Sequence, residues 1–138
     1  MTRAARYAYL VLAWVFVAGL AIQVFFAGLG IFAGASNFET HVNFGYLLHL
    51  SPILVLAAAA LSRAGRRHWQ WALALVAAVF VIPFFVYLRS ATPELAALHP
   101  VAAVVASWVA LRVALNSLVA VRRPEPAAEG SPGTAATA

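Results

Sequence analysis

Four long apolar runs, separated by short polar links, make up most of the chain. The runs predict helices over about residues 7–32, 37–61, 69–88 and 99–121. A helix that crosses the hydrocarbon core of a bilayer needs about 20 mostly apolar residues, and each run reaches that length. The first run is too long for the apolar core of a signal peptide, about 7–15 residues, so we expect it to be retained as a helix. The pattern therefore predicts an all-α fold: a polytopic membrane protein whose single domain, residues 1–123, is an antiparallel four-helix transmembrane bundle.

Local signals refine this expectation. Ser36 and Glu39 match a capping box, in which each side chain accepts a hydrogen bond from the other residue's backbone N–H, and so predict a helix start just after Ser36. Pro52 and Pro83 lie inside the second and third runs, so we expect a kink in each helix, and each proline deprives a carbonyl one turn earlier of its usual donor. Residues 124–138, rich in Pro, Ala, Gly, Ser and Thr, have no apolar face and predict a disordered cytoplasmic tail.

Arginine is distributed unevenly between the two ends of the predicted bundle. One end carries seven arginines and the other only Arg89. Because short loops rich in Lys and Arg stay on the cytoplasmic side, we expect both termini to be cytoplasmic. The Ala-rich composition, with Arg as the only cation, is typical of a GC-rich bacterium, so we expect a bacterial cytoplasmic (inner) membrane location. The seven arginines are Arg3, Arg6, Arg63, Arg66, Arg67, Arg122 and Arg123.

Composition limits the classes of function. The chain is 64% hydrophobic and 9% charged, against about 45–50% and about 25% in soluble domains. Despite the net charge of +5, we expect the arginines to contact anionic lipid headgroups of the bilayer and not nucleic acid, since no groove-reading module is present. The absence of cysteine excludes thiolate metal sites, thiol catalysis and disulfides. No nucleophile–base pair, carboxylate pair or phosphate-binding glycine loop is found, which argues against an enzyme.

Polar side chains are predicted to gather in the half of the bundle away from the arginine-rich end. His41, Gly45 and His49 are spaced by four residues and share one face of the second helix. His99 begins the fourth helix, and Gln23 of the first lies at about the depth of His49. Imidazole is a usual axial ligand of haem iron, so His41 and His99 are candidate ligands of a haem b, with Gly45 making space and Gln23 and His49 beside the cofactor. The alternatives are interfacial histidines in contact with solvent, and a neutral His49 bonded to Gln23 or to a backbone carbonyl.

Arg112 is predicted to lie inside the fourth helix and not at its end. A charged side chain there is costly, and no acid is predicted within the membrane to pair with it. We expect its guanidinium to reach the headgroups on the arginine-rich side or to stack on Trp108, one turn away. An anion or haem-propionate site is the other interpretation.

Three segments together resemble a known family: Gln23–Gly30, Phe38–His41 with Gly45–Leu47, and Ala97–Val101. They are similar to a bacterial family of small four-helix integral membrane proteins of unknown function, over roughly residues 6–123. The resemblance implies the fold but no activity. In that family the residue after the His-Pro-Val stretch of the fourth helix is often Asn. Ala stands there in this chain, so any role of that amide is absent.

A looser likeness links the chain to four-helix b-type cytochromes and to one half of haem A synthase. Those bundles place a haem-ligating histidine at the outer ends of the second and fourth helices. His41 and His99 match these positions by helix order and depth. The likeness is one of fold, and a fold alone does not establish function.

Three classes of function remain open from the sequence. The leading hypothesis is a small membrane protein that binds haem b between its second and fourth helices and exchanges electrons with a membrane redox partner or a quinone. The second is a cofactor-free structural or accessory membrane subunit. The third is a small-solute or proton transporter that uses His49. The paired histidines favour the first class, and the lack of an intramembrane acid weakens the third.

Reporter fusions test the predicted topology. Alkaline phosphatase, which is active only outside the cytoplasm, should be active when fused at residues 36 and 92 and inactive at residues 65 and 130, because the arginine-rich loops stay inside. Green fluorescent protein at the same sites should give the opposite pattern. A cytoplasmic signal at residue 36 would contradict the four-helix topology.

Overall fold

The computed structural model describes residues 2–122, and that range is helical apart from short links. Four helical spans are long and apolar enough to cross a membrane, and no residue in the described range forms a strand. The all-α fold and the polytopic four-helix transmembrane bundle are therefore confirmed. The elements are α1 (Thr2–Phe32), η1 (Ala35–Asn37), α2 (Phe38–Leu61), α3 (Arg66–Tyr87), η2 (Leu88–Ser90), α4 (Pro93–Ala96) and α5 (Leu98–Arg122).

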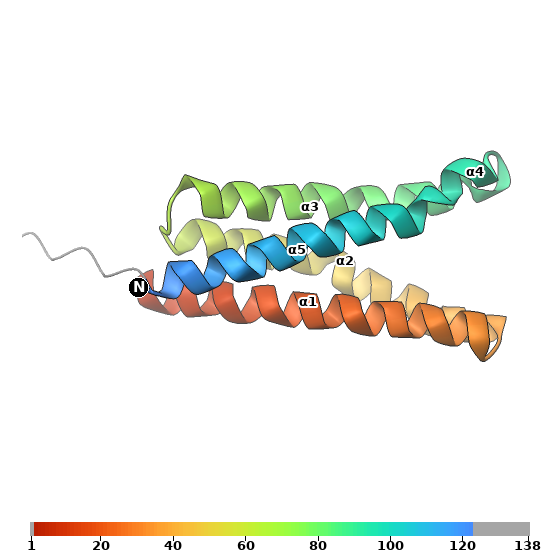
Figure 1. Cartoon of the computed structure of the whole chain (residues 1–138), viewed down its shortest axis with the longest axis horizontal. Coiled ribbons are helices and arrows are strands. Elements are labelled where there is room, and N and C mark those ends of the chain that lie inside the picture. The colour runs from red at the N-terminus through yellow and green to blue at the C-terminus, as the bar shows by residue number, and fades with distance from the viewer. Residues whose placement is uncertain (1, 123–138) are drawn as a thin grey trace, which may run out of the picture.

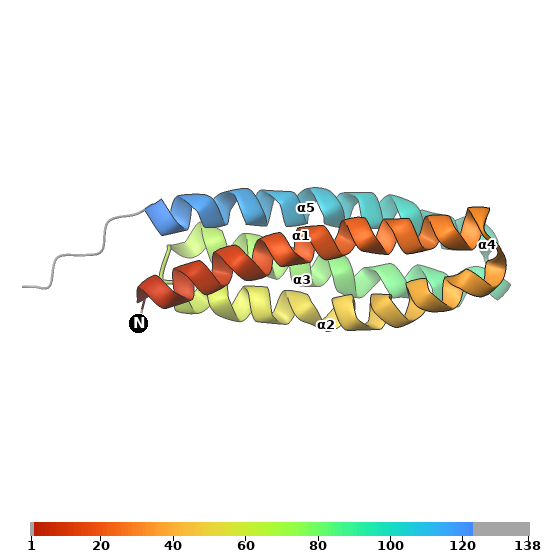
Figure 2. The same ribbon diagram turned by 90° about the horizontal axis from the view of Figure 1, so that it is seen from below.

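The four long helices lie side by side and alternate in direction (Figure 1). α1 packs against α2 and α5, and α3 packs against the same two helices. The start of α1, the turn between α2 and α3 and the end of α5 lie together at one end, which we call the inner end because it carries the arginines. The opposite, outer end holds η1, η2 and α4 (Figure 2).

The core of the bundle is confined to its inner half. All four long helices contribute, and many of the buried residues are alanines, which let helices approach closely and gain van der Waals contact. This close packing is the main physical basis of the fold, because lipid tails are as apolar as the side chains and burial by itself gives little driving force. The buried hydrophobic residues are Tyr9, Ala13, Phe16, Val55, Ala58, Ala59, Ala64, Ala72, Leu75, Val79, Ala106, Val109, Ala110, Val113, Ala114 and Ala120.

The outer half is packed more loosely. Across residues 20–51 and 80–105, Gly30 is the only residue that is fully buried. Figure 1 shows α1 and α5 separating toward the outer end. Polar and aromatic side chains of this half are therefore only partly covered by the rest of the chain.

Polar contacts fasten the helices at the inner end. The Tyr9 hydroxyl of α1 donates to the Val113 carbonyl of α5 at 3.2 Å, and the Arg6 Nε donates to the Ser62 carbonyl at 3.4 Å. His68 of α3 is 5% exposed and packs edge-on against Tyr9, with ring centroids 6.1 Å apart. These contacts join α1 to the end of α2, the start of α3 and the last turns of α5.

A serine side chain next to the proline in α2 replaces the backbone hydrogen bond that the proline removes. Pro52 lies buried inside the helix, and α2 changes direction near its middle (Figure 1). The carbonyl that Pro52 leaves without a backbone donor is that of Leu48. Ser51 Oγ donates to this carbonyl at 2.7 Å, so the kinked helix keeps the group satisfied.

Several helix ends differ from those expected. α1 begins at Thr2, five residues before the expected start, and α3 begins at Arg66 and not at residue 69. Gly65 precedes α3 with a φ of 108°, a conformation that L side chains rarely adopt. The extra short helix α4 lies in the link before α5. The tail, residues 124–138, lies outside the described residues.

The predicted capping box at the start of α2 is wrong. Ser36 lies within η1, and Asn37 occupies the N-cap with no side-chain cap hydrogen bond. Asn37 Nδ2 instead donates back to the carbonyls of Ala33 and Gly34, at 3.2 and 3.1 Å. A capping box needs an extended residue at the N-cap, whereas η1 runs directly into α2 with Asn37 in a helical conformation. The short turn between α1 and α2 therefore takes precedence over the local motif.

Ser51→Ala should destabilise the bundle by about 1 kcal/mol, since it leaves a carbonyl unpaired inside an apolar helix. Ser107→Ala is the matched control, because Ser107 Oγ donates at 2.8 Å to the Ala103 carbonyl, which has a normal helical donor as well. Unfolding of the detergent-purified variants, followed by circular dichroism, measures both effects. Equal losses of stability in the two variants would contradict the role assigned to Ser51.

Candidate functional site

Gln23 of α1 and His41 of α2 hold each other by hydrogen bonds in the outer half. Gln23 Nε2 donates to the His41 carbonyl at 2.9 Å, and His41 Nδ1 lies 3.1 Å from the Gln23 carbonyl. Gln23 Nε2 is also 3.4 Å from His41 Nε2. Each residue thus uses its backbone and its side chain toward the other, which fixes the register of α1 against α2 at this depth.

Gly45, one turn after His41, makes room for this pair. A Cβ built on Gly45 would lie 2.8 Å from Gln23 Nε2, closer than real Cβ contacts. The sequence predicted that Gly45 creates space for a cofactor. In the structure, that space is filled by the Gln23 amide.

His99 lies next to His41, although the two residues come from different helix pairs. Their ring centroids are 6.4 Å apart with an interplanar angle of 72°. His99 Nδ1 lies 3.2 Å from the carbonyl of Ile82 in α3. All four long helices therefore meet at this point: α1 and α3 through carbonyl oxygens, and α2 and α5 through imidazoles.

The two carbonyls determine which ring nitrogen carries the proton. A carbonyl oxygen can only accept a hydrogen bond, so Nδ1 of each histidine donates to it. In the neutral rings, Nε2 is then left with a lone pair. Histidines that bind metals almost always donate their other ring N–H in this way, so His41 and His99 have the tautomer that binding through Nε2 requires, while His41 Nε2 faces the Gln23 amide at 3.4 Å.

His49 lies apart from this pair. Its ring stacks on Phe80 of α3 with centroids 4.2 Å apart and a tilt of 39°. The His49 side chain is half-buried. The acids within residues 2–122 are Glu39 and Glu94, and both belong to elements at the outer end. The structure brings His41, and not His49, to His99, and neither hydrogen bond predicted for His49 is formed.

The rest of the site consists of donors and acceptors without further metal ligands. Among residues 2–122, no group of three or more His, Cys, Asp or Glu side chains is close enough to hold a metal ion. Gln23 Oε1 is buried and has no hydrogen-bond partner in the described part of the chain. The site therefore combines two imidazoles with one unused amide oxygen. The spacing of His41 and His99 from the helix starts predicted their common depth, but only the structure reveals the carbonyls that anchor them.

Comparison with known families gives one match. Residues 23–91, half of the chain, match the family of unknown function DUF6220. The chain belongs to this family. The match includes Gln23, His41, Gly45 and His49, and it agrees with the resemblance to small four-helix proteins of unknown function. No curated protein and no solved structure matches the chain, so the likeness to b-type cytochromes stays a prediction from helix order.

Gly45→Ala should destabilise the outer half by about 1–3 kcal/mol, because the added methyl group displaces the Gln23 amide. In a Gln23→Ala background the same substitution should cost much less, since the conflicting atom is gone. Gly28→Ala is the control, because nothing lies within 4 Å of a Cβ built at Gly28. Thermal unfolding in detergent measures the cycle. A Gly45→Ala cost that is unchanged by the Gln23 truncation would show that the two residues are not coupled.

Proposed function

We propose that this family member is a small integral membrane protein that binds a haem b between His41 of α2 and His99 of α5 and transfers electrons. The observation that carries the proposal is the pairing of two imidazoles from different helices, 6.4 Å apart, each with Nδ1 directed at a backbone carbonyl. Histidine is the commonest metal ligand among side chains, and bundle proteins build cofactor sites from residues on facing helices.

The separation of the rings supports this assignment. Two imidazoles that hold one metal ion through Nε2 have ring centroids within about 7 Å of each other, because each metal–nitrogen bond is about 2 Å long. The observed separation of 6.4 Å falls in this range.

The kind of ligand follows from the donor set. A metal ion held by the protein alone usually needs three or four protein ligands, and no such group exists in the described part of the chain. A haem would need fewer protein ligands than a bare metal ion, and His41 and His99 are the residues that would hold its iron. Covalent attachment to the protein uses a Cys-Cys-His motif, and the chain has no cysteine, so binding would be non-covalent, as in b-type sites. A bound haem b would supply reversible one-electron transfer at this position.

The outer half of the bundle is the part in which the chain covers its own side chains least. Its side chains are only partly covered, and the helix pairs α1–α2 and α3–α5 separate toward this end (Figure 1). The Gln23 amide, 3.4 Å from His41 Nε2, would turn aside on binding. This rotation of the Gln23 side chain would move its unpartnered Oε1 and would leave the Nε2 lone pair of His41 free to bind iron.

The location of the site suggests the class of partner. If the arginine-rich inner end is cytoplasmic, His41 and His99 lie in the half of a bacterial inner membrane that faces away from the cytoplasm. The described residues form little beyond the membrane spans. A suitable electron partner is therefore a quinone in the bilayer or another membrane redox protein at the outer face.

A cofactor-free accessory subunit is the second candidate, and one observation favours it. Gln23 and His41 already form hydrogen bonds with each other, as in a purely structural contact between α1 and α2. Interhelical hydrogen bonds in membranes contribute about 0.6 kcal/mol on average. Under this alternative, His41 and His99 only hold the outer ends of the four helices together.

A visible spectrum of protein expressed with ample haem separates the two candidates. The haem proposal predicts the sharp bands of a six-coordinate low-spin haem after reduction. His41→Ala and His99→Ala should each abolish or broaden these bands, because losing one axial ligand changes the spin state. His68→Ala is the control, since that residue lies at the inner end against Tyr9, and its loss should leave the bands in place.

Two further outcomes decide the assignment. His49→Ala should shift the bands only slightly, and their complete loss would mean that His49 is the ligand on α2. Protein that purifies colourless and binds no added haem would rule out the proposal in favour of the accessory subunit.

A further inference from the structure

Arg112 and Asn116 of α5 form a second polar site, far from the histidine pair and in the inner half of the bundle. The two residues are one turn apart and therefore lie on the same side of the helix. Arg112 Nε and Asn116 Nδ2 are both buried, and neither has a hydrogen-bond partner within residues 2–122. Leaving such groups unpaired in an apolar environment is costly, so these two donors indicate a ligand.

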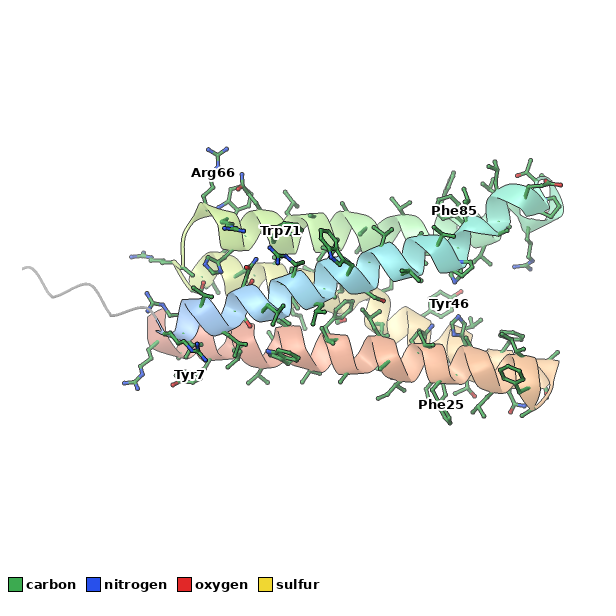
Figure 3. All side chains as sticks on the ribbon, viewed as in Figure 1. Tyr7, Phe25, Tyr46, Arg66, Trp71 and Phe85 are labelled. Atoms are coloured by element: carbon green, nitrogen blue, oxygen red, sulfur yellow. The ribbon has the colours of Figure 1, made fainter. Side chains whose placement is uncertain are left out.

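Two tryptophans form an aromatic wall beside these donors. The Arg112 guanidinium carbon lies 5.8 Å from the centroid of the Trp71 ring. Trp71 packs edge-on against Trp108, with ring centroids 5.7 Å apart. Stacking on Trp108 was one of the two contacts predicted for Arg112, the other being the lipid headgroups. The ring under the guanidinium belongs instead to Trp71 of α3, labelled in Figure 3. The site thus bridges α3 and α5.

The chemistry of the missing ligand follows from these groups. Both unpaired atoms are N–H donors and one belongs to a permanent cation, so the ligand must be rich in acceptor oxygens and anionic. The acids among residues 2–122 are Glu39 and Glu94, which lie in the outer-end elements. Neither can reach Arg112 across the bundle.

The surroundings favour a lipid over a soluble anion. Trp108 is 56% exposed on a membrane-spanning helix, so the site opens toward the bilayer. Trp71 lies five residues into α3, which begins at Arg66, or about 7–8 Å along the helix axis. Arg112 itself lies ten residues, or about 15 Å, before the end of α5, so the site is below the level of the exposed inner-end arginines, and a lipid bound there would have its headgroup drawn in between α3 and α5.

We propose that Arg112 and Asn116 bind the phosphodiester of an anionic phospholipid, with the glycerol and the first acyl carbons against Trp71 and Trp108. Arg112 would donate from its planar guanidinium to the phosphate oxygens, and Asn116 would add a neutral donor. This lipid site does not depend on haem binding, since it lies in the other half of the bundle and uses none of the same residues.

Native mass spectrometry of the full chain in detergent tests the proposal with two probes, dioleoyl phosphatidylglycerol and dioleoyl phosphatidylcholine. The wild-type protein should retain the anionic lipid preferentially. Arg112→Gln should lower its apparent affinity for phosphatidylglycerol about tenfold, the effect of losing a charge-assisted hydrogen bond. Asn116→Leu, which keeps the side-chain volume, should lower it about threefold and provides a second test if Arg112→Gln folds poorly.

Arg66→Gln is the matched control, because it removes the same charge from an exposed position at the inner end, and its affinity should stay within about twofold of wild type. Equal losses in Arg66→Gln and Arg112→Gln would overturn the proposal in favour of diffuse surface charge.

Displacement of the lipid by excess inorganic phosphate would also overturn the lipid proposal, since the site would then bind a small anion. So would lipid retention that appears only after deletion of residues 124–138, because Glu125 or Glu129 would then be the natural partner of Arg112. The visible spectrum should be unchanged in Arg112→Gln, so the lipid and haem proposals can fail independently.

Discussion

Close packing of small side chains in the inner half holds this bundle together. In a bilayer, burying an apolar side chain against protein gains little over burying it against lipid, so helices associate mainly where their backbones can approach. Ala72 of α3 and Ala106, Ala110 and Ala114 of α5 are almost fully buried and permit that approach. The hydrogen bond from Tyr9 to the Val113 carbonyl adds a directional contact between α1 and α5. Because this half is so well packed, the outer half need not be.

The loose packing of the outer half is what makes the histidine pair a candidate site. His41 and His99 are half-buried and are oriented by carbonyls of the neighbouring helices α1 and α3. Each helix pair therefore presents one oriented imidazole toward the other pair. A ligand bound at both rings would bridge the two pairs at the end where direct packing is weakest, so binding and stability of the outer half would be coupled.

The two polar sites differ in which hydrogen-bonding atoms they leave unpaired. At the outer site, most donors and acceptors are already paired, and the remaining acceptors are His99 Nε2, His41 Nε2 in front of the Gln23 amide and Gln23 Oε1, which would suit a metal centre. At Arg112 and Asn116 the remaining capacity is two unpaired N–H donors, which suits an oxyanion. The two ligand hypotheses for this chain of 138 residues are therefore separate, because the sites offer different chemistry and have no residue in common.

The sequence by itself determined the number, type and span of the long helices, because each apolar run is long enough to cross a bilayer and unsatisfied backbone groups are excluded there. It also placed His41 and His99 at a common depth, since depth follows from the rise per residue. It could not identify the partners of these side chains. The Gln23 amide in front of Gly45, the carbonyls beside the two histidines, Trp71 beneath Arg112 and the loss of the Ser36 capping box all depend on how helices distant in sequence rotate and pack against one another. That packing was decided only by the tertiary structure, because rotation about a helix axis is set by contacts between helices and an almost uniformly apolar sequence encodes it weakly.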